Sequence, residues 1–271
     1  MICSVNPSAA ARSPWLPNFK PKPHAKVRLF CFPYAGGSTL IYRKWQDSLS
    51  PDIEVCPVQL TGRGSRLQET PFKSMTQLIP VLAQGLTDYL DKPCAFFGHS
   101  MGAMISFELA RYLKIVKGFE ITHLFVSGRR APQLPNLDPY TFNLPEAEFV
   151  EELRRLNGTP KEVLFHTELM RLMIPLLRAD FELVETYSYV TGSPLTCPIT
   201  AFGGSDDGDE AAGLLDPWRE QTESSFSLHM FPGDHFFLHT AQPQLTEIIS
   251  QELSDTKLPP HKNSQITQLC L

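Results

Sequence analysis

Residues 96–103, which read FFGHSMGA, constrain the fold of this chain more than any other stretch. Two aromatic residues close an apolar run, Ser100 lies between two glycines at the spacing G-x-S-x-G, and residues 104–113 follow with helical apolar spacing. This order predicts a strand, a sharp turn and a helix. A serine in such a turn adopts a strained backbone that exposes its hydroxyl above the sheet, and glycines leave room for the chain to fold back. We interpret Ser100 as a candidate nucleophile, with an ordinary surface loop as the alternative.

A nucleophilic serine also needs backbone amides that hold an oxyanion, and two segments supply candidates. The amide of Met101 opens the helix after the turn, where it can face a bound anion. Residues 27–32 form a continuous apolar run with one charge, which predicts a strand covered on both faces. The glycine pair at residues 36–37 follows, and such a loop presents its amides without side chains in the way. We expect Ala35 to be the second donor; an ordinary strand-to-helix turn is the alternative for this loop.

Further apolar runs alternate with helical patterns along the chain. The expected strands are residues 53–60, 121–127, 199–202 and 227–231, and the expected helices are residues 74–90 and 243–253. Pro57 cannot donate to a sheet ladder, so its strand should lie at an edge or contain a bulge. Pro80 limits where the helix of residues 74–90 can start. The alternation is typical of an α/β fold, with a mostly parallel sheet and crossover helices.

Between about residues 132 and 189 the strand signals vanish and amphipathic helices are expected instead, at residues 146–156, 162–173 and 175–187. A helical insertion between strands is where a lid or the wall of an acyl pocket would lie. Its large apolar residues either line that pocket or form the insertion's own core, which we favour for most of them. They are Phe142, Phe149, Phe165, Met170, Met173, Leu176 and Phe181.

Candidates for a base and an orienting acid follow the last two predicted strands. Asp206, Asp207 and Asp209 share one loop after residues 199–202, and His235 follows residues 227–231 in the run PGDHFF. The chain order Ser, Asp, His, each after a strand, is the order of α/β-hydrolases. Ser100 would attack a carbonyl carbon, His235 would move its proton, and the aspartate would orient the imidazole. We favour Asp207 as that aspartate, with Asp206 as the alternative.

The other histidines in predicted elements have structural interpretations. His99 lies inside the turn and should pack beneath it, and His123 lies in an apolar run typical of a core histidine. His229 lies on a strand, and His239 lies on the side of the final helix. His235 is therefore the expected base.

Charge and cysteine usage bear on partners and compartment. The 271 residues carry 24 Lys and Arg against 29 Asp and Glu, a formal charge of -5, which argues against binding to nucleic acid or an anionic membrane. The six cysteines are scattered with no C-x-x-C pair, so we expect reduced packing residues in a cytoplasmic protein. They are Cys3, Cys31, Cys56, Cys94, Cys197 and Cys270. We see no signal peptide and no run of membrane-spanning length.

The domain organisation predicted from these patterns is simple. Residues 1–25 lack an apolar period and should be a flexible arm, residues 26–253 should form one α/β domain with its insertion at about 132–189, and residues 254–271 should be a disordered tail. Arg63 and Arg66 lie in a glycine-rich loop and are either a phosphate contact or a solvated structural rim.

Five ordered motifs within residues 27–253 together resemble the type II thioesterase family, the stand-alone α/β-hydrolases that accompany non-ribosomal peptide and polyketide synthases. They are FPYAGG at 32–37, QLTGRGSR at 59–66, GHSMGA at 98–103, AFGG with its aspartates from 201, and FPGDHFF at 231–237. The medium-chain fatty-acid synthase thioesterase is a relative of this family. Two positions depart from its pattern: Thr61 replaces the usual proline, and the extra carboxylates near residue 206 leave the register of the acid open by one residue.

The resemblance implies a triad of Ser100, Asp207 and His235, with oxyanion amides at Ala35 and Met101. It implies a substrate in which an acyl group forms a thioester with the phosphopantetheine arm of a carrier protein, and no cofactor or metal. In this family the usual task is hydrolytic editing of misacylated or stalled carrier domains. We expect a monomer whose partners are the acyl or peptidyl carrier domains of a synthase.

Three other functions compete with this interpretation. A chain-terminating thioesterase would release medium-length fatty acids, and a general carboxylesterase would prefer simple esters. A protein that kept the scaffold without turnover would be a binding protein. The complete Ser, Asp, His set argues against the last of these.

Overall fold

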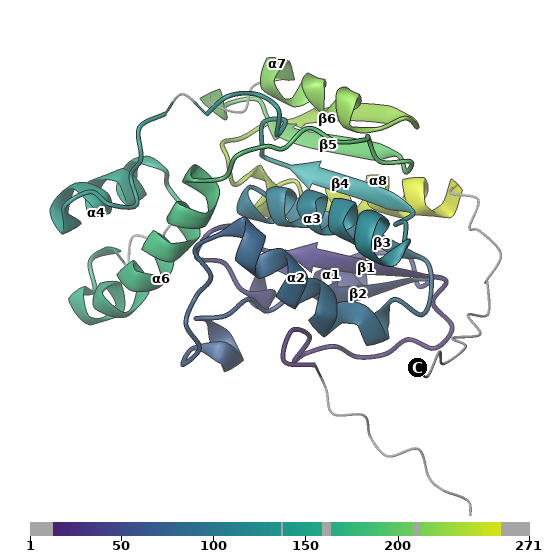
Figure 1. Ribbon diagram of the computed structural model, residues 1–271, viewed down its shortest axis with the longest axis horizontal. Helices are drawn as coiled ribbons and strands as arrows, with labels where there is room; N and C mark the ends of the chain where they lie inside the picture. Colours follow the sequence, from purple (N-terminus) through teal and green to yellow (C-terminus); the bar gives the residue numbers. More distant parts are fainter. Residues whose placement is uncertain (1–12, 137, 159–163, 209–211, 256–271) are drawn as a thin grey trace, which may run out of the picture.

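The computed structural model describes residues 13–136, 138–158, 164–208 and 212–255. A six-stranded sheet in the order β2-β1-β3-β4-β5-β6 runs through its centre, and every neighbouring pair is parallel (Figure 1). Its strands are β1 (Val27–Phe32), β2 (Ile53–Pro57), β3 (Cys94–His99), β4 (His123–Ser127), β5 (Ile199–Gly204) and β6 (Phe226–Phe231). All six strands therefore end at the same edge of the sheet.

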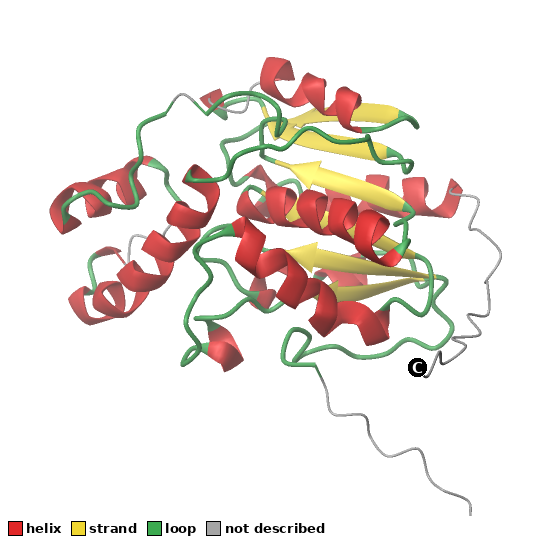
Figure 2. Cartoon of the chain, in the orientation of Figure 1, coloured by secondary structure: helices red, strands yellow, loops and turns green. Residues whose placement is uncertain are grey.

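Helices cover both faces of the sheet, as the continuous apolar strands require (Figure 2). The helices α2 (Met75–Leu86) and α3 (Met101–Tyr112) lie on one face, and α1 (Trp45–Ser48) and α8 (Gln242–Asp255) lie on the other. Alternate residues of β1 enter the two cores: Phe30 packs on the α2–α3 side and Cys31 on the α1–α8 side. The predicted α/β architecture with a parallel sheet is confirmed.

The described residues also form several short helical turns. They are η1 (Thr39–Tyr42), η2 (Gly64–Arg66), η3 (Thr87–Tyr89), the π turn η4 (Leu113–Lys117), α7 (Ala212–Leu215), η6 (Asp216–Gln221) and η7 (Phe237–His239). Most predicted elements are found with ends shifted by a few residues. Pro57 ends β2 at the edge of the sheet, as predicted. The helix α2 starts at Met75 and contains Pro80, because burial of its apolar face outweighs the one backbone hydrogen bond that proline removes.

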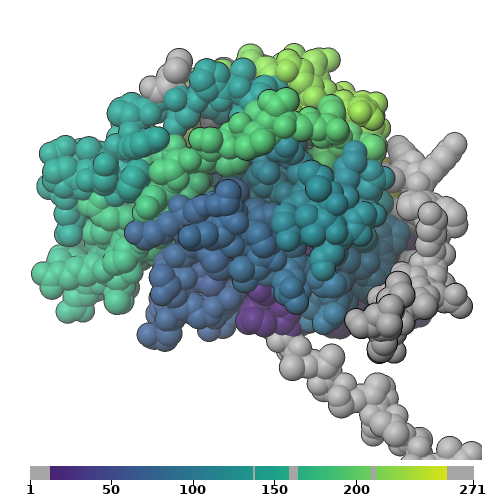
Figure 3. All heavy atoms as spheres, viewed as in Figure 1, coloured from purple at the N-terminus to yellow at the C-terminus, as the bar shows by residue number. Residues whose placement is uncertain are grey.

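The insertion forms a lobe at the edge where the strands end (Figure 3). It consists of α4 (Glu146–Arg155) and α6 (Thr167–Glu185). The helices expected at residues 162–173 and 175–187 form one continuous helix, α6, so the predicted division before Pro175 is wrong. Proline has no backbone N–H, and this removes one hydrogen bond without ending the helix. The lobe has its own core, made by Phe149, Leu153, Met170, Ile174 and Leu177, whereas Phe165 is exposed.

The N-terminal segment differs from the flexible arm expected for residues 1–25. Trp15, Leu16 and Phe19 are buried in the core on the α2–α3 side, and the Arg66 guanidinium lies 4.0 Å from the centre of the Trp15 ring. The expectation is therefore wrong for residues 13–25, because an irregular segment can bury single large side chains without any apolar period. Residues 1–12 lie outside the described residues, as do residues 256–271 of the expected tail, while Ser254 belongs to α8.

The cysteine prediction holds where the structure describes it. Cys31, Cys56, Cys94 and Cys197 are free and buried, while Cys3 and Cys270 lie outside the described residues. Across the described ranges, no helix is both long enough and apolar enough to cross a membrane.

His123 is a core histidine, as predicted. Its ring stacks on Phe125 with 4.1 Å between centroids, and its Nε2 lies 2.9 Å from Thr200 Oγ1. Burial lowers the pKa of His123 from 6.5 to about 3, because the charged form loses its hydration. The folded protein therefore binds this proton only in strong acid.

This shift predicts an acid-sensitive fold. The unfolded chain protonates His123 near pH 6.5 and the folded chain does not until about pH 3, so stability falls as pH drops between those values. The unchanged protein should lose unfolding free energy when the pH falls from 7 to 5. In His123→Gln this group no longer titrates, so the loss should be about 2 kcal/mol smaller. Urea unfolding at the two pH values measures this difference; equal losses in both proteins would contradict it.

Candidate active site

The predicted turn around Ser100 is present between β3 and α3. Ser100 has φ 53° and ψ −115°, one of two positive φ values among the described non-glycine residues, and it is the residue before the first turn of α3. Its amide donates to the carbonyl oxygen of Ser127 at 2.7 Å, which fixes the turn to the end of β4. A strained residue held in this way at a strand end presents its side chain above the sheet.

Glycine is required on both sides of Ser100 because backbone passes too close for a side chain. A Cβ at Gly98 would lie 2.1 Å from the Gly102 carbonyl oxygen, and a Cβ at Gly102 would lie 2.1 Å from the carbonyl oxygen of Phe32. The second contact brings the end of β1 against the start of α3. The loop that follows Phe32 therefore begins beside the serine turn.

The structure brings His235 and Asp207 together. Asp207 follows β5 and is buried, and its Oδ2 lies 2.7 Å from His235 Nδ1. Asp206 is exposed and its carboxylate instead accepts a hydrogen bond from Ser205 Oγ at 3.0 Å. Asp209 lies outside the described residues. Of Asp206 and Asp207, the structure pairs Asp207 with His235. Because Nδ1 of His235 contacts this carboxylate, Nε2 on the other side of the ring points away from it.

His99 packs beneath the turn, as expected. It is fully buried, its Nδ1 lies 2.9 Å from Ser127 Oγ, and its ring centre lies 5.1 Å from that of His235. This contact places the His235 ring beside His99, the last residue of β3, which directly precedes Ser100 in the chain. Burial, with a smaller effect from the charge of His235, lowers the pKa of His99 well below 6.5, so His99 is neutral at physiological pH.

The predicted oxyanion donors come from the two segments that meet at the Gly102–Phe32 contact. Met101 is the first residue of α3, where helix geometry leaves the amide without an intrahelical acceptor. Ala35 lies in the wall of a cavity of about 330 Å³ between the loop after β1 and α6. The cavity is lined by Tyr34, Ala35, Gly36, Gly37, Ser38, Leu40, Ile41, Gly158, Met173, Leu177 and His239. A second cavity of similar volume, near Arg129 and Tyr187, contains none of the predicted site residues.

The two loop arginines do not form the solvated rim considered from the sequence. Both are buried: Arg66 contacts Glu69 and the Trp15 ring, and Arg63 forms an ion pair with Asp180 of α6. Asp180 is a residue that sequence reasoning missed. The available signal was a carboxylate on the apolar face of an amphipathic helix, near Leu176 and Leu183, because a charge in that position needs a buried partner.

The part of the chain that the structure describes contains no cluster of three or more His, Cys, Asp or Glu side chains placed to hold a metal ion.

The parallel sheet, the strained serine turn and the His–Asp pair at the carboxyl ends of the strands define an α/β-hydrolase fold. A family model described as the thioesterase domain matches residues 27–253. The chain belongs to this thioesterase family, and its enzyme class is that of a thioester hydrolase.

Individual relatives match this chain over most of its length. A protein from Brevibacillus parabrevis named linear gramicidin dehydrogenase LgrE is 48% identical over 244 residues, which cover 89% of this chain and 93% of the relative. The gramicidin S biosynthesis protein GrsT of Aneurinibacillus migulanus is 44% identical over 239 residues, covering 88% and 93%. The solved structure of BorB, the type II thioesterase from the borrelidin biosynthetic cluster, is 37% identical with a TM-score of 0.79, covering 86% of this chain and 94% of that one. The resemblance to type II thioesterases is thereby confirmed.

The close backbone approach at Gly102 predicts a large effect of one methyl group. In Gly102→Ala the new Cβ meets the Phe32 carbonyl, and we expect the unfolding free energy to fall by about 1–3 kcal/mol, as in other overpacked sites. Gly213→Ala in α7 is the matched control, because no atom lies within 4 Å of its Cβ position. Urea unfolding compares them; equal stabilities of the two variants would contradict the packing described.

Proposed function

We propose that this protein hydrolyses acyl thioesters carried on the phosphopantetheine arm of synthase carrier proteins, and that it edits misacylated or stalled carriers of non-ribosomal peptide or polyketide assembly. The observation that carries the chemistry is the His235–Asp207 pair beside the strained turn of Ser100. The synthase context comes from the biosynthetic names of GrsT and BorB.

In the proposed mechanism Ser100 is the nucleophile. Its hydroxyl attacks the thioester carbonyl while His235 Nε2 accepts the proton, and Asp207 stabilises the imidazolium through Nδ1. The tetrahedral oxyanion is held by the amides of Ala35 and Met101, each worth about 3 kcal/mol of barrier. The C–S bond then breaks, and the pantetheine sulfur leaves as a thiol with the proton that His235 carries, which returns the imidazole to its neutral form. His235 next deprotonates a water molecule that attacks the acyl-enzyme carbonyl, and it returns this proton to Ser100 Oγ as the free acid leaves.

The cavity beside Ala35 is the proposed place for the acyl group or its arm. Its walls combine the loop after β1 with two apolar residues of α6, Met173 and Leu177. Such a chamber suits an apolar chain whose carbonyl lies at the polar end. We also infer a cytoplasmic location, which the four free, buried cysteines support.

The name of LgrE denotes a dehydrogenase, which is a different chemistry. A dinucleotide-binding sheet has G-x-G-x-x-G in the turn after its first strand, to receive the pyrophosphate. Here β1 is followed by PYAGGS, and the sequence contains no G-x-G-x-x-G. The residues therefore favour acyl hydrolysis over hydride transfer.

The choice of acid is tested by a pair of neighbouring variants. Asp207→Asn keeps the shape of the side chain but removes the charge that orients His235, so we expect kcat to fall by about 10³–10⁴. Asp206→Asn is the control and should leave kcat unchanged, since its carboxylate contacts Ser205. Steady-state hydrolysis of an acyl-pantetheine thioester measures both. Full activity of Asp207→Asn would refute the assignment.

The substrate class is tested with carrier proteins loaded with acetyl, aminoacyl, peptidyl and decanoyl groups. An editing enzyme should release the short and aminoacyl groups, with Ser100→Ala inactive on all of them. A strong preference for decanoyl carriers would instead show a chain-terminating enzyme. Faster cleavage of p-nitrophenyl esters than of any carrier thioester would show a carboxylesterase.

A further inference from the structure

We propose that Asp180 of α6 is a positioning residue for the loop that follows β1, and that its ion pair with Arg63 sets the direction of the Ala35 amide. This inference rests on the proposed function, because it takes Ala35 as an oxyanion donor. It assigns to the insertion a part in holding the transition state in addition to covering the site.

Asp180 contacts both of the loops that lie beneath α6. Its Oδ1 lies 2.6 Å from Arg63 Nη2 and its Oδ2 lies 2.8 Å from Arg63 Nη1, so the pair is bidentate. The amide of Gly36 donates to the same Oδ2 at 2.7 Å. Arg63 Nη1 also donates to the Gly37 carbonyl at 3.1 Å. One carboxylate and one guanidinium therefore hold the peptide group before Gly36 and the peptide group after Gly37.

These bonds restrict Ala35, which immediately precedes Gly36. The Gly37 amide donates to the carbonyl of Tyr34 at 2.9 Å, which closes the turn around Ala35. With the Gly36 amide fixed by Asp180, both peptide planes that flank Ala35 are anchored. A donor held in advance costs no reorganisation when the oxyanion forms. The direction of the Ala35 N–H thus depends on a side chain 145 positions along the chain.

Apolar packing joins α6 to the same loop. A Cβ placed on Gly36 would lie 2.7 Å from Leu177 Cδ2, and Leu177 precedes Asp180 by three positions on the same face of the helix. The pair itself is deeply buried, with side-chain exposures of 5% for Arg63 and 3% for Asp180. Since a buried pair is costly to desolvate, it is weak evidence of stabilisation and is better explained by the geometry it imposes.

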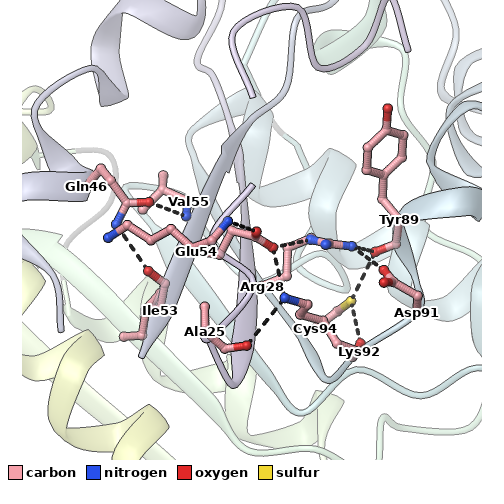
Figure 4. A network of polar contacts seen from close by, with 11 residues as sticks. Ala25, Arg28, Gln46, Ile53, Glu54, Val55, Tyr89, Asp91, Lys92 and Cys94 are labelled. Atoms are coloured by element: carbon pink, nitrogen blue, oxygen red, sulfur yellow. Dashed lines mark hydrogen bonds and ion pairs between the residues drawn. The ribbon is translucent and has the colours of Figure 1, made fainter. Parts of the chain in front are cut away.

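A second buried ion pair in the chain provides a matched control. Arg28 Nε lies 2.7 Å from Glu54 Oε2, with side-chain exposures of 6% and 1%, and Asp91 and Lys92 form further ion pairs with these two residues (Figure 4). Arg28 lies near the start of β1, about 13 Å along the strand from Phe32. Breaking this pair should weaken the fold without reaching the loop that contains Ala35.

The experiment compares Asp180→Asn with Glu54→Gln, both of which remove a buried charge. For Asp180→Asn we expect kcat per folded molecule to fall about tenfold or more on p-nitrophenyl ester and acyl-pantetheine substrates, with KM changed by less than about threefold. Affinity for an aryl boronate, which forms a tetrahedral anion on serine, should fall by a similar factor. For Glu54→Gln the urea midpoint should fall while kcat and boronate affinity stay near those of the unchanged protein.

Arg63→Lys provides a second test that does not depend on the folding of Asp180→Asn. Lysine keeps the charge but loses the bidentate geometry, so kcat and boronate affinity should fall partially. Unchanged kcat and boronate affinity in both site variants would overturn the proposal, and so would an equal loss in Glu54→Gln. If the proposed function is wrong, the protein without substitutions will not hydrolyse carrier thioesters. Ester hydrolysis and boronate binding would still test the role of Asp180 in that case.

Discussion

The left-handed backbone of Ser100 is the constraint on which the rest of the site depends. It exists because β3 turns into α3 with no room for side chains at Gly98 or Gly102, and the amide of Ser100 is tied to β4. Strain of this kind persists only where the surroundings over-determine it. The same crowding places the end of β1 beside the start of α3, so one packing arrangement positions both the serine and the loop with Ala35.

The parallel sheet brings the remaining groups to that turn. Because β5 and β6 end at the same edge as β3, the loops with Asp207 and His235 meet there although 135 positions separate Ser100 from His235. The insertion adds further contacts to the loops at this edge of the sheet. Through Asp180 it contacts Arg63 and Gly36, so the helix that walls the cavity also holds the loop beneath it.

Sequence patterns predicted the parts of this structure that rest on local order. The strand β1 and the serine turn follow from apolar runs and glycines, and His235 and the loop that carries its aspartate follow from the chain order of acid and base. The choice between Asp206 and Asp207 could not be predicted from the sequence, because it depends on how one loop turns. In the structure the Asp206 amide donates to the Gly233 carbonyl and the Asp207 amide donates to the Gly204 carbonyl. Two further features could not be predicted from local patterns. The Arg63–Asp180 pair joins residues 117 positions apart, and Trp15 is buried although its segment has no periodic apolar pattern.

The most direct test of the central claim, that the strained serine is the nucleophile activated by His235, is covalent labelling of the folded protein with a fluorophosphonate followed by peptide mass spectrometry. The account predicts a single phosphonyl adduct, on Ser100, that forms quickly in the unchanged protein and slowly in His235→Ala. Labelling of another serine, or no adduct in a protein that is shown to be folded, would contradict it.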